Sequence, residues 1–208
     1  MITIIDYGMG NLRSVANAFE ALGREVQCVG EPEALASATA IVLPGVGAFG
    51  DAMENLWTKG LVDALDHEVR GKGKPFLGLC LGLQLLAERG TEQGDHRGLG
   101  WIPGVCRRLE RRSNDPDIHI PHIGWNDVSI RKAEGLYRDL GDVQAFYFVH
   151  SYILCAADDS VVSGICDHGE DFAASIETGN VWATQFHPEK SHKAGLSLLN
   201  NWCAAARC

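Results

Sequence analysis

Short apolar runs alternate with amphipathic segments over the first part of the chain. Runs rich in isoleucine, valine and leucine predict strands, and apolar residues spaced three or four apart predict helices between them. The predicted strands are Ile2–Asp6, Glu25–Val29, Ala40–Leu43 and Pro75–Leu79, and the predicted helices are 12–22, 31–38, 51–70 with a break at Gly60, and 81–89. Asn11 is placed to cap the first helix and Gly23 to end it. This alternation predicts a parallel sheet covered on both faces.

After Gly90 the pattern changes to strand-like segments with few helices. The segments are 105–110, 126–130, 144–154, 161–166, 173–178 and 181–186, followed by one strong helix over 191–206. They predict an antiparallel β extension that completes the same sheet. The sequence shows no linker and no internal repeat, so we expect residues 1–208 to form a single domain. The expected fold is α/β and flavodoxin-like: an open, mostly parallel twisted sheet with helices on both faces.

Composition narrows the classes of function. Hydrophobic residues make up 46% and charged residues 22%, which is typical of a globular protein, and the formal net charge is −9. That charge argues against a general nucleic-acid or membrane-surface binder. No stretch approaches the roughly 20 apolar residues that span a bilayer. The 7 cysteines show no CxxC pair, which is typical of free thiols in a reducing compartment, so we expect a cytoplasmic protein without a metal site.

Two glycine-rich loops follow predicted strands. The loop Asp6–Asn11 has Arg13 where a dinucleotide-binding turn needs a third glycine. The loop Pro44–Gly50 lacks the Gly-Lys-Ser/Thr ending of a phosphate-binding loop. Its glycines let the backbone approach a ligand and present N–H groups to an oxyanion. A plain turn would have the same sequence, so this loop alone does not decide between the two.

Gly78-Leu79-Cys80-Leu81-Gly82 lies between a predicted strand and a predicted helix. The pattern G-x-C-x-G is the cysteine form of a nucleophile elbow, in which only small residues fit on either side of a sharp turn. The turn would hold Cys80 at the edge of the sheet, with the N–H of Leu81 as one oxyanion donor. A buried cysteine that only packs is the alternative.

A thiol nucleophile needs a base, and the base needs a group that orients it. Phe186-His187-Pro188-Glu189 ends the last predicted strand. His187 and Glu189 are two residues apart, so in extended backbone they share a face. His150 is the rival base, but it has no neighbouring carboxylate in the sequence.

These motifs, in the order Cys, His, Glu, resemble the class I glutamine amidotransferases, whose patterns G-x-C-x-G-x-Q and F-H-P-E match Gly78–Gln84 and Phe186–Glu189. The segments 7–12, 44–50, 121–126 and 147–152 are similar to the glutaminase subunits of imidazole glycerol phosphate synthases. Ile123 stands where such proteins often carry Met. The resemblance implies that L-glutamine is hydrolysed through a thioester without a cofactor. It also implies an obligate heterodimer, in which a separate barrel-shaped cyclase uses the ammonia for histidine biosynthesis.

The resemblance also implies a role for each matched residue. Cys80 is the nucleophile, His187 the base and Glu189 its orienter. The remaining expected residues are Leu81, Val46 and Gly47 for the oxyanion hole, Gly47, Gln84, His150, Ser151 and Tyr152 for the substrate, and Asn11, Trp125, Tyr147 and Lys190 for the partner interface. Capping by Asn11, burial of the two aromatic residues and solvation of Lys190 are the alternatives at the interface positions.

Three other functions remain open at this stage. The chain could serve as the glutaminase subunit of anthranilate or aminodeoxychorismate synthase, against which the segments 7–12 and 121–126 argue. It could be an intracellular cysteine peptidase with the same elbow, against which Gln84 and Phe186–Glu189 argue. A non-catalytic binding subunit would not need Cys80 and His187 together.

Overall fold

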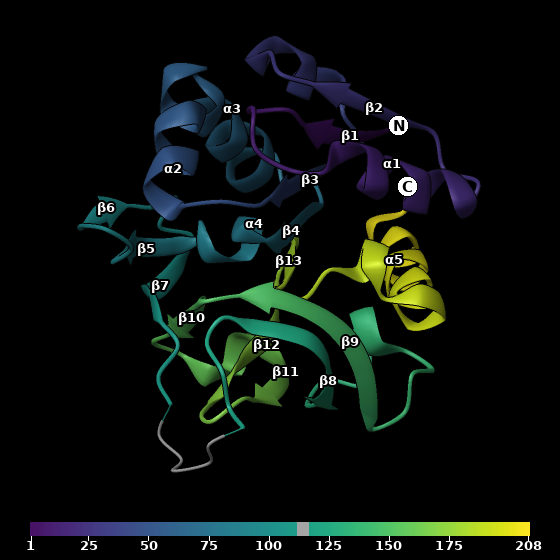
Figure 1. The fold of residues 1–208 in the computed structure, drawn as a ribbon. Coiled ribbons are helices and arrows are strands. Elements are labelled where there is room, and N and C mark those ends of the chain that lie inside the picture. Colours follow the sequence, from purple (N-terminus) through teal and green to yellow (C-terminus); the bar gives the residue numbers. More distant parts are fainter. Residues whose placement is uncertain (112–116) are drawn as a thin grey trace.

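The computed structural model describes residues 1–111 and 117–208, and its main body is a nine-stranded sheet (Figure 1). Five neighbouring strands are parallel: β2 (Val26–Val29), β1 (Ile2–Ile5), β3 (Ala40–Gly45), β4 (Phe76–Cys80) and β13 (Val181–Thr184). The sheet continues with antiparallel β12 (Asp171–Thr178), β11 (Val162–Asp167), β8 (His122–Ile130) and β9 (Val143–His150). The predicted fold class is confirmed.

Helices cover both faces of the parallel strands. The α-helices are α1 (Leu12–Ala21), α2 (Phe49–Thr58), α3 (Leu61–Leu65), the short α4 (Leu81–Gln84) and α5 (His192–Ala206). A π-helical turn spans Asp66–Gly71, and 3-10 turns span Pro32–Ser37, Gly135–Tyr137, Asp159–Val161 and Pro188–Lys190. Successive strand residues serve opposite faces, so Ile4 packs with α1 and α5 while Ile5 packs with α2 and α3. In the part of the chain that the structure describes, no helix has the length and apolar character needed to cross a membrane.

The segment after the nucleophile differs from the prediction. A helix was expected over 81–89, but α4 has only 4 residues, and Ala87–Gly90 forms strand β5. With β10 (Tyr152–Ala156), β7 (Ile102–Arg108) and β6 (His96–Arg97), β5 builds a second sheet. Leu83, Leu85 and Leu86 are all fully buried, so the segment has no polar face for a surface helix. Pairing with β7 therefore prevails over helix propensity.

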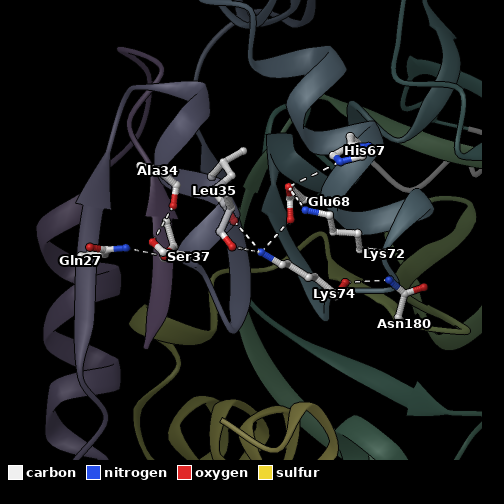
Figure 2. Close-up of polar contacts among 11 residues, drawn as sticks. Gln27, Ala34, Leu35, Ser37, His67, Glu68, Lys72, Lys74 and Asn180 are labelled. Carbon is white, nitrogen blue, oxygen red and sulfur yellow. Dashed lines mark hydrogen bonds and ion pairs between the residues drawn. The ribbon is translucent and has the colours of Figure 1, made fainter.

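A cluster of ion pairs and hydrogen bonds lies at the end of the sheet where β4 and β13 begin (Figure 2). Lys74 Nζ lies 2.7 Å from the buried carboxylate of Glu68 and donates to the Leu35 carbonyl at 2.7 Å. Hydrogen bonds from Lys72 and Lys74 lower the pKa of Glu68. Asn180 Nδ2 donates to the Lys74 carbonyl at 2.7 Å. Since Lys74 precedes β4 and Asn180 precedes β13, the cluster aligns the two strands that lead to Cys80 and to His187.

Candidate active site

Cys80 lies at the predicted strand–helix turn, in a backbone conformation that only glycine adopts easily. Its φ is 53° and ψ −102°, and the residue is only 5% exposed. A Cβ at Gly78 would lie 2.7 Å from the Gly82 carbonyl oxygen, and a Cβ at Gly82 would overlap the carbonyl oxygen of Leu43. Both glycines are therefore required by close packing, and together they hold the strained turn at Cys80 in place.

His187 and Glu189, the expected base and its expected orienter, are paired as the spacing suggested. Nδ1 of His187 lies 2.8 Å from Oε1 of Glu189, and the two side chains are 4% and 3% exposed. The backbone differs from the expectation, because β13 ends at Thr184 and residues Pro188–Lys190 form a 3-10 turn. Among the described residues, Nε2 of His187 is buried without a hydrogen-bond partner. That nitrogen is the one available to exchange a proton with a reacting group.

His187 is held as an imidazolium. Burial alone lowers the pKa of His187, but its interactions with Cys80 and then with Glu189 outweigh burial and raise that pKa to about 10. Near neutral pH the ring therefore carries protons on both nitrogens.

The backbone around His187 is fixed by Ser191, a residue that no sequence motif indicated. Ser191 Oγ donates to the His187 carbonyl at 2.6 Å and accepts from Tyr147 N at 3.0 Å. His187 N donates in turn to the Tyr147 carbonyl at 2.9 Å. In the sequence, Ser191 only indicated the start of the last helix, so its bond to His187 had no signal there.

A pocket of about 360 Å³ opens beside Cys80. It is lined by Val46, Gly47, Cys80, Leu81, Gln84, Glu92, Val149, His150, Ser151 and Tyr152. All the residues expected to form the oxyanion hole and to bind the substrate therefore meet at one cavity. Val149 lies in the family-like segment 147–152 but was given no role there, and Glu92 had no motif signal. Glu92 accepts the N–H of Phe49 at the start of α2 at 2.8 Å.

Gln185 connects the pocket wall to Cys80, and the sequence did not indicate it. Its Nε2 donates to Cys80 Sγ at 3.7 Å, and its Oε1 accepts from Gln84 Nε2 at 3.3 Å. Gln84 Nε2 also donates to the Tyr152 carbonyl at 2.9 Å. Both amide hydrogens of Gln84 are thus engaged, which leaves its carbonyl oxygen to accept from a ligand.

The expected oxyanion loop is open to solvent on one side. Val46 is 42% exposed and Gly47 has a φ of +116°, a conformation that favours glycine. Behind the loop, the Tyr7 hydroxyl abuts Gly45 and has no hydrogen-bond partner among the described residues. Burial first, and then Cys80, raise the pKa of Tyr7 well above its ordinary value, so the hydroxyl stays protonated.

The expected interface residues divide into a surface cluster and a cap. Trp125 is 48% exposed and stacks on His192 with ring centroids 5.1 Å apart. The ring of Tyr147 meets Trp125 edge-on at 6.2 Å, and Lys190 Nζ lies 6.0 Å from the Tyr147 centroid. Asn11 caps α1 by accepting from Ser14 N at 3.2 Å, as its alternative interpretation required. The alternative interpretation, that the two aromatic residues are buried, is wrong for Trp125, because this side chain is exposed as an interface residue would be.

The strand–elbow–helix arrangement, together with the buried His–Glu pair, is the architecture of a triad amidotransferase. The model of the family "Glutamine amidotransferase class-I" matches residues 3–206, and the chain belongs to this family. Within the family it is 50% identical to imidazole glycerol phosphate synthase subunit HisH of Aquifex aeolicus, over 96% of this chain and 94% of that protein. It is 46% identical to the HisH subunit of Moorella thermoacetica, over 97% and 93% of the two chains.

Solved structures agree on the fold. A crystal structure of a glutamine amidotransferase matches with a TM-score of 0.76 at 18% identity, covering 100% of both chains. A chain in the structure of PurLQS from Thermotoga maritima matches with a TM-score of 0.75 at 18% identity, covering 98% of this chain and 97% of that one. In residues 1–111 and 117–208, no group of three or more His, Cys, Asp or Glu side chains gathers in a way that would hold a metal ion.

Proposed function

We propose that this chain is the cytoplasmic glutaminase subunit of an imidazole glycerol phosphate synthase. It hydrolyses L-glutamine to glutamate and ammonia, and a separate barrel-shaped cyclase subunit uses the ammonia in histidine biosynthesis. The observation that carries the proposal is the strained Cys80 turn at the pocket of about 360 Å³, next to the buried pair of His187 and Glu189. The identity to HisH subunits over nearly the whole chain supports this choice among the amidotransferases.

The reaction follows from the groups that meet at the site. The Cys80 thiolate attacks the side-chain amide carbon of glutamine, and the oxyanion that forms is stabilised by N–H groups of Leu81 and the Val46–Gly47 peptide. The His187 imidazolium gives its Nε2 proton to the leaving nitrogen, so ammonia departs and a thioester remains. The neutral ring then takes a proton from water, which attacks the thioester. Glu189 keeps the ring oriented throughout.

Substrate selection rests on the pocket wall. Gln84 has only its carbonyl oxygen left to offer, and that atom is an acceptor for the α-ammonium group of an amino acid. Gly47, Ser151 and Tyr152 line the same cavity and are placed to hold the α-carboxylate, and His150 supports this wall. We assign the partner interface to the surface of Trp125, Tyr147 and Lys190, with Asn11 at its margin.

Synthesis with the purified cyclase partner tests this function. Cys80→Ala should abolish glutamine-dependent synthesis and leave synthesis from ammonium salts unchanged, because only the source of ammonia is lost. Glutamine hydrolysis that persists in Cys80→Ala would overturn the nucleophile assignment. Ammonia transfer to chorismate-derived acceptors, or cleavage of peptides, would instead identify a different amidotransferase or a peptidase.

A further inference from the structure

Two buried histidines lie behind the glutamine pocket, and the reaction just described uses neither ring. His122 on β8 is 3% exposed and His150 on β9 is 6% exposed, and the two are register partners across the sheet. Nδ1 of His122 lies 3.0 Å from Nε2 of His150. One of these two nitrogens must carry the shared hydrogen, so the bond has a direction that the neighbours determine.

Asn126 sets that direction. Its Oδ1 accepts from the N–H of Asp127 at 2.8 Å, and its Nδ2 donates to the Asp167 carbonyl at 2.9 Å, so the amide orientation is fixed. The second hydrogen of Nδ2 points to Nε2 of His122, 3.3 Å away. Nε2 of His122 must therefore be an acceptor, and the ring carries its hydrogen on Nδ1.

Both rings are neutral, so each ring has one N–H hydrogen to donate. Burial lowers the pKa of His122 to about 3, aided by His150 and by His168, whose ring stacks on His122 at 3.9 Å. Burial also lowers the pKa of His150 to about 4. His122 Nδ1 then donates to His150 Nε2, and His150 Nδ1 donates to the Tyr152 carbonyl at 3.0 Å.

The Tyr152 carbonyl is where this relay meets the substrate pocket. The same oxygen accepts from Gln84 Nε2 at 2.9 Å, so its position sets the position of the Gln84 amide. If the hydrogen of His150 moved to Nε2, the bare Nδ1 and the Tyr152 oxygen would be two acceptors 3.0 Å apart. One of them would have to move, and the Gln84 amide would lose its fixed orientation.

We propose that His122 and Asn126 are positioning residues for substrate binding, which fix the tautomer of His150 and thereby hold the Tyr152 carbonyl and the Gln84 amide toward glutamine. The inference rests on the proposed glutaminase function and adds two residues of β8 to its machinery. Ile123 and Trp125 of the same strand are exposed at 61% and 48%, so β8 carries outward-facing apolar residues as well as the relay.

Kinetics in the complex with the cyclase test the relay with matched variants. His122→Leu removes the donor to His150, whereas His122→Asn keeps an amide donor near the place of Nδ1. Phe172→Leu is the packing control, since its ring lies 5.9 Å from His122 and 5.1 Å from His150 without a hydrogen bond to either. His122→Leu should raise KM for glutamine about tenfold, the effect of one lost hydrogen bond, with kcat and ammonium-dependent synthesis nearly unchanged. His122→Asn and Phe172→Leu should stay close to the wild type.

Three kinetic results would overturn the relay: an unchanged KM in His122→Leu, equal impairment in His122→Asn, or equal impairment in Phe172→Leu. A second measurement needs no variant. Nitrogen-15 NMR of the wild-type protein near pH 7 should show His122 and His150 neutral with the hydrogen on Nδ1, and a hydrogen on Nε2 of either ring contradicts the relay. A wild-type complex that does not hydrolyse glutamine would count against the proposed function instead, and the NMR result would still decide on the relay.

Discussion

Nδ1 of His187 lies 2.8 Å from Oε1 of Glu189 inside a site where both side chains are almost fully buried. The carboxylate of Glu189 accepts the hydrogen of Nδ1, and Nε2 has no hydrogen-bond partner among the described residues. Against the effect of burial, interactions with Cys80 and then with Glu189 raise the pKa of His187 to about 10, so the ring is an imidazolium near neutral pH. That imidazolium carries the proton that the departing ammonia needs.

Removal of the Glu189 charge should lower the pKa of His187. In the wild type that pKa is raised from 6.5 to about 10, so the proton stabilises the folded state fully below pH 6.5, and this stabilisation is lost as the pH rises toward 10. Glu189→Gln should therefore lower the NMR titration midpoint of His187. The free energy of unfolding should also fall less steeply between pH 6.5 and about 10 than in the wild type. An unchanged midpoint would mean that Glu189 does not sustain the imidazolium.

Trp125→Ala should weaken binding of the cyclase by roughly 30-fold, because exposed tryptophans at the centre of interfaces are frequent hot spots. Isothermal titration calorimetry measures the change. Trp57→Ala is the matched control: Trp57 is 43% exposed on α2 and lies under Arg97 of β6, outside the surface assigned to the partner. If the wild type and Trp125→Ala bind the cyclase with equal affinity, the partner interface lies elsewhere on the surface.

Lys74→Met should destabilise the fold by about 2–4 kcal/mol, since it leaves the buried Glu68 carboxylate and the Leu35 carbonyl without the ammonium group between them. Arg70→Ala breaks the exposed pair with Asp66, at 57% and 54% side-chain exposure, and should change stability by less than about 1 kcal/mol. Urea unfolding compares the two. Similar losses in both variants would show that the Lys74 cluster does not align β4 and β13.

Tyr7→Phe should leave the free energy of unfolding unchanged or raise it by up to about 1 kcal/mol. The hydroxyl of Tyr7 is buried without a hydrogen-bond partner among the described residues, so its removal relieves a desolvation penalty while the ring keeps its packing. Thermal and urea unfolding give the answer. A loss of about 1 kcal/mol or more would reveal a bond that the hydroxyl makes in solution.

The sequence was informative wherever a residue type is dictated by backbone geometry. Gly78 and Gly82 had to be glycines because side chains would collide at the Cys80 turn, and this requirement is legible as a local motif. Asn11 and Gly60 likewise marked a helix start and a helix break. The predicted helix over 81–89 failed because burial on all sides and pairing with β7 are long-range effects that no local pattern reports.

Residues that act through tertiary hydrogen bonds could not be found in the same way. Gln185 contacts Cys80 and Ser191 contacts His187 through hydrogen bonds that depend on the folded arrangement. His122 lies in the family-like segment 121–126, but nothing in the sequence indicated its contact with His150, which follows from the register of β8 and β9. Cys80, His187 and Glu189 could be proposed as a triad from the sequence because all three sit in family motifs, whereas the residues that contact them are set by topology.

The central claim is that glutamine is opened by Cys80 through a covalent thioester. Acid quenching of the cyclase complex during glutamine turnover, followed by peptide mass spectrometry, tests it most directly. We expect a glutamyl adduct on the peptide that contains Cys80, and no adduct in Cys80→Ala. An adduct on one of the other cysteines, or full turnover by Cys80→Ala, would contradict it.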